Sequence, residues 1–122
     1  MKASFERRSF KVWEYKVSHG MLLVRSPKNL PAPERNIDIM LAGIDYFDLP
    51  GSCKTLELDD ASAEDVAFVE DRLGKRVAAK NIFVFICDSR RHVVVAAGIK
   101  VAETEMDLFQ SPFDQTGSQG SG

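Results

Sequence analysis

The chain has 122 residues, of which 44% are apolar, and a formal net charge of −2 at pH 7. This length suits one compact domain that buries about two thirds of the surface of its unfolded chain. The first residues carry charges where a signal peptide needs an apolar region, and no apolar run approaches the roughly 18 residues of a membrane span. These features predict a soluble, cytoplasmic protein that does not enter the membrane. We expect one globular domain over residues 1–114 and a disordered Gly/Ser-rich tail over residues 115–122.

Charge is distributed unevenly along the chain. Residues 1–35 hold eight Lys or Arg against three Glu, a net +5, whereas residues 36–122 hold eight basic against fifteen acidic residues, a net −7. The acidic remainder argues against nucleic-acid binding, although aromatic and basic side chains alternate over residues 10–16 as they do on base-stacking surfaces. We expect the oppositely charged segments to pair across neighbouring strands, with a docking surface as the alternative.

Residues 11–27 alternate in polarity around a His-Gly pair, which predicts a β-hairpin. With His19 and Gly20 as a two-residue loop, the register pairs Glu14 with Arg25, so that opposite charges face each other across the strands. Gly20 adopts a positive φ at little cost, and the turn therefore explains His19 without a catalytic role.

The segment after this hairpin, residues 26–36, contains three prolines and predicts an extended surface connection. A strand that begins at residue 37 and ends before Pro50 and Gly51 is then predicted, followed by a short strand over residues 54–58.

Residues 59–76 predict a helix, with Ser62 and Asp65 at capping-box spacing, Asp60 as an alternative N-cap and Gly74 beyond the last apolar residue. The residues of its apolar stripe are Val66, Val69 and Leu73. The acidic first turn and the basic last turn suit the helix dipole. A divalent-metal site would need carboxylates that converge from separate turns, which this segment does not offer.

Residues 81–88 and 92–103 are almost continuously apolar, as expected of two central strands covered on both faces and joined by a short hairpin turn. The pattern predicts an α+β fold, a mostly antiparallel sheet of about six strands with one helix packed on one face. A right-handed crossover from strand 54–58 through the helix to strand 81–88 is an alternative, and it would place one parallel pair in the sheet.

No catalytic residue, metal site or cofactor is predicted, because the spacing matches no triad, ligand set or phosphate loop. Cys53 and Cys87 are expected to be two buried thiols, with a disulfide left open for an exported protein. A pocket between helix and sheet would draw its polar groups from Asp38, Asp45, Cys87 or His92.

Five residues are predicted to bind a partner. Phe68 and Arg72 lie on the helix away from the apolar stripe. Either the helix is buried more broadly than usual or the Phe68 ring contacts another chain, and we expect the second. Arg90, Arg91 and His92 form a compact cationic point at a hairpin tip that can hold a carboxylate or a phosphate.

The function expected from these features is that of a non-catalytic interaction module that binds a protein partner or itself by surface complementarity, such as an accessory or immunity-type protein of a bacterial system. The alternative is a small-molecule-binding protein or enzyme with its pocket between helix and sheet.

Overall fold

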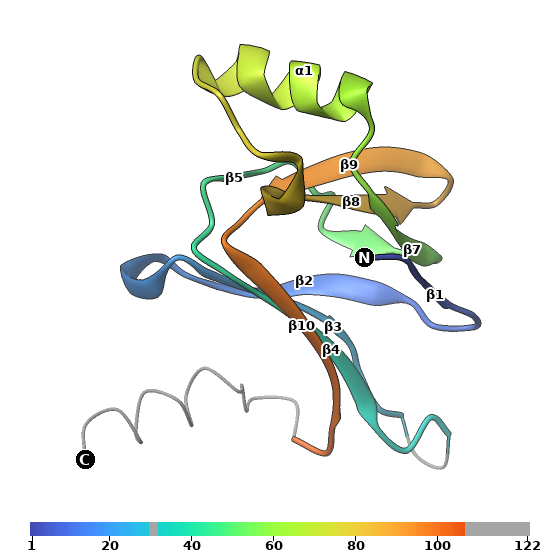
Figure 1. Cartoon of the computed structure of the whole chain (residues 1–122). Coiled ribbons are helices and arrows are strands. Elements are labelled where there is room, and N and C mark those ends of the chain that lie inside the picture. Colours follow the sequence, from blue (N-terminus) through green and yellow to red (C-terminus); the bar gives the residue numbers. More distant parts are fainter. Residues whose placement is uncertain (30–31, 107–122) are drawn as a thin grey trace.

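In the described part of the chain, two antiparallel sheets of five strands face each other, and one α-helix lies over the outer face of one of them (Figure 1). The structure, a computed structural model, describes residues 1–29 and 32–106. Sheet A runs in the order β1 (Ala3–Phe5), β7 (Leu56–Asp60), β8 (Ile82–Cys87), β9 (Arg90–Val95) and β5 (Tyr46–Phe47). Sheet B runs in the order β10 (Gly98–Thr104), β4 (Asn36–Ala42), β3 (Met21–Ser26), β2 (Phe10–Lys16) and β6 (Ser52–Cys53). The helix is α1 (Ala63–Leu73), and two short 3₁₀ turns are η1 (Val17–His19) and η2 (Ala79–Asn81). The predicted tail, residues 115–122, lies outside the described residues.

The predicted α+β class and antiparallel pairing are confirmed, but the prediction of one sheet of about six strands is wrong. Residues 92–103, predicted as one strand, belong to β9 in sheet A and β10 in sheet B. An apolar run has no marker for the point where a chain leaves one sheet for another, because both strands bury the same kinds of residue. The parallel crossover is also absent, since β7 and β8 pair antiparallel.

The chain changes sheets twice at one place. The β4–β5 and β9–β10 connections meet where Gly43 lies against Ala97, whose N–H donates to the carbonyl of Ala42 at 2.9 Å. A Cβ on Gly43 would lie 2.8 Å from the Cβ of Ala97, and Gly43 has a φ of +67°. Glycine is therefore required here both for space and for backbone conformation.

Two apolar clusters hold the layers together. The cluster between the sheets contains, among others, Phe10, Leu22, Val24, Ile39 and Leu41 from sheet B and Leu56, Leu58, Phe85 and Val94 from sheet A. The cluster under α1 contains Val69, Ile82, Val84, Val93 and Val95, with Val66 and Leu73 packed against it. The predicted helix stripe and the burial of residues 82–87 on both faces are thus confirmed.

The helix begins and ends as predicted. The Ser62 hydroxyl accepts the N–H of Asp65 at 3.2 Å, and the Asp65 carboxylate accepts the N–H of Ser62 at 2.8 Å, which completes a capping box. The C-cap is Gly74. None of the described helices is long and apolar enough to cross a membrane.

The register predicted for the first hairpin is wrong. Glu14 pairs with Leu23 rather than with Arg25, because the 3₁₀ turn Val17–His19 precedes Gly20 and lengthens the loop. A bulge farther along β2 shifts the register again. Gly20 does adopt the expected positive φ, +56°, and His19 lies exposed in the turn.

The prediction of two free thiols is also wrong. Cys53 and Cys87 form a disulfide with their Cα atoms 5.4 Å apart, and both residues are buried. The bond joins β6 of sheet B to β8 of sheet A, so it links the two layers covalently. Two cysteines 34 residues apart carry no sequence signal of their proximity, which only the facing of the sheets creates.

Candidate functional site

The outer surface of α1 carries an aromatic ring that packs into neither apolar cluster. Phe68 is 40% exposed, and the guanidinium carbon of Arg72 lies 5.1 Å from the centroid of its ring. This distance is that of a cation–π contact. The prediction that Phe68 lies off the core stripe is confirmed. Within the described ranges 1–29 and 32–106, no carboxylate lies within 4.0 Å of the Arg72 guanidinium.

Arg91 is occupied by contacts within the chain. Its guanidinium donates to the Asp65 carboxylate at 2.8 Å and lies 3.5 Å from the carboxylate of Asp59. These hydrogen bonds lower the pKa of Asp65 to about 2, although partial burial opposes the shift, and they raise the pKa of Arg91. Arg91 therefore fastens the first turn of α1 to β9.

Arg90 and His92 point to the opposite face of β9 from Arg91. They pair across the hairpin with Cys87 and Phe85, which belong to the cluster between the sheets. Directly opposed residues share a face, so Arg90 and His92 lie at the rim of the sandwich. Strand alternation thus divides the three basic residues predicted to form one compact point.

His92 and Asp48 form a weak pair at this rim. Nδ1 of His92 lies 3.8 Å from the Asp48 carboxylate, which also accepts the N–H of Val93 at 3.0 Å. The carboxylate therefore fixes the β5–β9 edge of sheet A.

The four residues proposed for a pocket do not converge. Asp38 is buried within sheet B, Asp45 pairs with Lys75, Cys87 is in the disulfide, and His92 lies at the rim of the sandwich. The space between α1 and sheet A is filled by the apolar cluster under the helix.

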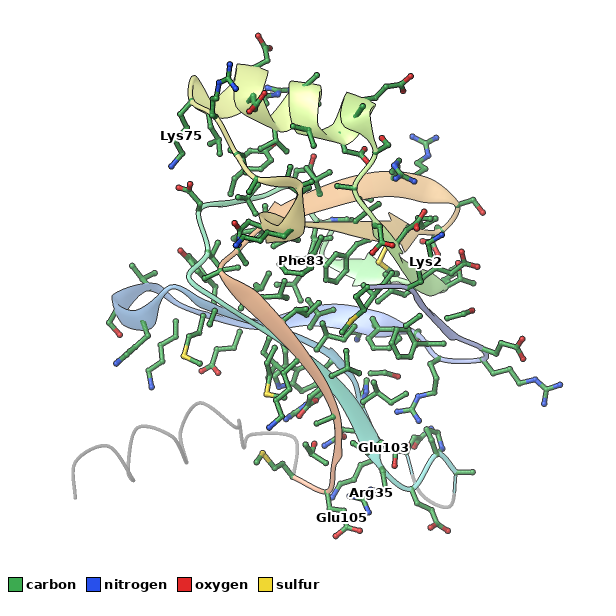
Figure 2. The ribbon with its side chains drawn as sticks, viewed as in Figure 1. Lys2, Arg35, Lys75, Phe83, Glu103 and Glu105 are labelled. Atoms are coloured by element: carbon green, nitrogen blue, oxygen red, sulfur yellow. A yellow bond between two sulfur atoms is a disulfide. The ribbon has the colours of Figure 1, made fainter. Side chains whose placement is uncertain are left out.

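A surface pocket of about 330 Å³ lies instead beyond the C-terminal end of α1. Its lining includes Gly43, Asp45, Lys75, Arg76 and Asn81, and Figure 2 shows Lys75 at this end of the helix. The Lys75 ammonium lies 2.5 Å from the Asp45 carboxylate, so these two of the three charged residues in the lining neutralise each other.

A buried ionic cluster in sheet B was missed by the reasoning from sequence. Arg25 and Asp38, 1% and 0% exposed, form two hydrogen bonds of 2.7 and 3.0 Å, and Thr104 donates to the same carboxylate at 2.8 Å. The Arg25 guanidinium also lies 5.3 Å from the ring of Trp13. The sequence did contain one sign of this cluster, an Arg inside the otherwise apolar run of residues 21–26. Because its members are satisfied by one another, this cluster serves the sheet rather than a substrate.

Charge pairs across strands continue at the end of sheet B. Figure 2 shows Arg35 beside Glu103 and Glu105, and its guanidinium lies 3.7 and 3.5 Å from their carboxylates. With the Arg25–Asp38 pair, these contacts join the basic N-terminal third of the chain to its acidic remainder, as the charge distribution predicted.

Within the part of the chain that the structure describes, no group of three or more His, Cys, Asp or Glu is placed to hold a metal ion. The strongest candidate for a functional surface is therefore the outer face of α1 around Phe68 and Arg72. Comparison with protein-family models, with curated proteins and with solved structures finds no match, so the function has to be argued from these residues.

Proposed function

We propose that the protein is a non-catalytic interaction module that binds a protein partner through the outer face of α1. The observation that carries this proposal is the exposed ring of Phe68 with the Arg72 guanidinium stacked on it. Leaving a large aromatic side chain in water forgoes up to about 2 kcal/mol of burial free energy. Aromatic residues, Phe among them, and Arg are also enriched in protein interfaces relative to the rest of the surface.

An accessory or immunity-type role in a bacterial system fits this proposal, because such a protein acts by occupying a surface of its partner. The surface here is rigid, since α1 is capped at both ends and tied to β9 by Arg91. Rigid presentation reduces the entropy that is lost on binding. Arg90 and His92, at the rim of the sandwich, extend the candidate surface only if the partner reaches past the start of α1.

Affinity capture with paired variants tests the proposal. Phe68→Glu should lose the proteins that the wild type retains from extracts of the native organism, as measured by quantitative mass spectrometry. Val17→Glu is the matched control, because Val17 is 78% exposed and lies on the hairpin turn of sheet B, away from α1. Equal retention by the wild type and Phe68→Glu, with both variants folded, would contradict the proposal.

The alternative function, binding of a small molecule, has weaker support. The helix–sheet interface where the pocket was expected is filled, and the 330 Å³ pocket beyond α1 is open at the surface. Small-molecule sites bury most of their ligand. A ligand there would compete with the Lys75–Asp45 ion pair.

The disulfide bears on the cellular compartment in which the protein works. The sequence predicted the cytoplasm, whereas the Cys53–Cys87 disulfide favours an oxidising compartment, because cytosolic thiols are kept reduced. Alkylation of free thiols at the moment of lysis of native cells distinguishes the two. Modified Cys53 and Cys87 would place the working protein in a reducing compartment.

A further inference from the structure

We infer that the partner seated on α1 is a second copy of this chain, with the two helices packed antiparallel about a two-fold axis that passes beside Phe68. This inference rests on the proposed function of the α1 face and names its occupant. It is carried by the order of charges along that face.

Three exposed residues recur at intervals of four along the solvent side of α1. They are Glu64, Phe68 and Arg72, an acid, an aromatic residue and a base in chain order. Residues four apart lie on the same side of a helix, one turn above another. The outer face of α1 is therefore acidic toward its start, aromatic at its centre and basic toward its end.

Two copies of this face are complementary in charge when their helices run antiparallel. A two-fold axis at Phe68 places the Glu64 carboxylate of each copy opposite the Arg72 guanidinium of the other, and the two Phe68 rings meet at the centre. This is an isologous interface, in which each contact occurs twice. A parallel arrangement would instead place carboxylate against carboxylate and guanidinium against guanidinium, which is unfavourable.

The two charges are available for this pairing. In the described part of the chain, neither Glu64 nor Arg72 has an ion pair within 4.0 Å. They are eight positions apart, about 12 Å along a helix that rises about 1.5 Å per residue, so they do not neutralise each other within one copy. A guanidinium fork and a carboxylate match in geometry and bind most strongly when water is excluded, as the aromatic centre would do.

The neighbouring carboxylate of Asp65 does not compete for Arg72. It is bound to Arg91 and to the Ser62 backbone, which holds it against β9 and away from the outer face. On the outer face, Phe68 thus has Glu64 on its N-terminal side and Arg72 on its C-terminal side, where the exposed Asp71 also lies.

Sedimentation of the purified chain over a range of concentrations tests the inference. The wild type should reach the mass of a dimer, and Glu64→Arg and Arg72→Glu should each weaken it by about 10-fold or more, since two attractive pairs become repulsive. The exchange variant, Glu64→Arg with Arg72→Glu, should restore dimerisation because both pairs reform with reversed charge.

The decisive measurement is an equimolar mixture of the two single variants. The Glu64→Arg chain is basic at both ends of the outer face, and the Arg72→Glu chain is acidic at both ends. In an antiparallel two-fold pair these ends face each other, so the mixture should form a heterodimer although neither variant dimerises well alone. Lys100→Glu and Glu6→Arg are matched controls, because both are exposed and lie on β10 and before β2, away from α1. They should leave the dimer unchanged.

Two outcomes would overturn the inference. One is a wild type that stays monomeric at every concentration, and the other is a mixture of folded single variants that stays as dissociated as its components. Loss of captured protein with Phe68→Glu would leave the proposed function standing in either case, and α1 would then bind a different protein.

Discussion

The side chain of Asp65 performs two tasks that belong to different levels of the structure. It completes the capping box of α1 with Ser62, and it accepts hydrogen bonds from Arg91 of β9. The first contact is local and follows from a spacing of three residues, whereas the second joins residues 26 positions apart. One carboxylate therefore fixes both where the helix begins and where it sits on sheet A.

Asp65→Asn should lower the free energy of unfolding at neutral pH by about 1–2 kcal/mol, with the pair partly screened because Arg91 is half-exposed. The folded-state pKa of about 2 lies below the ordinary 3.8, so the folded protein gains stability from the ionised carboxylate above pH 3.8 and loses it as the pH falls toward 2. The difference between wild type and variant, measured by urea unfolding at several pH values, should shrink over that interval.

Asp71→Asn is the control, because Asp71 is exposed on the same helix. A wild-type-minus-variant difference that stays constant from neutral pH down to about pH 2 would contradict the assigned role of Asp65.

Three strands of sheet B are joined by a buried cluster of polar side chains as well as by backbone hydrogen bonds. Arg25 of β3 and Asp38 of β4 stand directly opposite each other, and Thr104 of β10 binds the same carboxylate. A shift of either strand by one residue would separate the buried charges and leave them unpaired. The pair therefore specifies the register of β3, β4 and β10.

Asp38→Asn should destabilise the protein by about 3 kcal/mol or more, because a buried guanidinium loses its counter-charge. The double variant Arg25→Met with Asp38→Leu should cost less than Asp38→Asn alone, since no buried charge remains. Thermal or urea unfolding of the three proteins measures the order. A double variant less stable than the single one would show that the hydrogen bonds of the cluster stabilise the fold, and not only the balance of its two charges.

The whole molecule is a sandwich whose layers are joined in three ways. The apolar cluster between the sheets supplies the contact area, the two connections cross at Gly43 and Ala97, and the disulfide closes the β6–β8 side. The disulfide is the link between side chains among these that is covalent, and it closes a long segment that includes β7 and α1.

Cys53→Ala with Cys87→Ala should lower the free energy of unfolding by about 3–4 kcal/mol, the chain-entropy value for a loop of 34 residues. Urea unfolding of the variant and of the wild type, the latter with and without reductant, measures this cost. The reduced wild type should resemble the variant. Equal stability of the oxidised and reduced proteins would show that packing alone holds the layers together.

Several local features of the chain, though not the register of the first hairpin, were determined by the sequence alone. Both caps of α1, its apolar stripe, the exposed position of Phe68 and the burial of residues 82–87 on both faces depend on residues within a few positions of one another. Helical and strand periodicities and capping hydrogen bonds involve residues only a few positions apart in the sequence. They were therefore predicted correctly.

Only the tertiary structure decided how these elements associate. The division of residues 92–103 between two sheets, the Cys53–Cys87 bond and the burial of Arg25 with Asp38 depend on which faces meet. An apolar residue buries equally well against any apolar surface, and a cysteine carries no mark of its partner. The contact between Arg91 and Asp65 also depends on the tertiary structure. It requires both that Arg91 lies on the helix side of β9 and that the first turn of α1 packs over that strand.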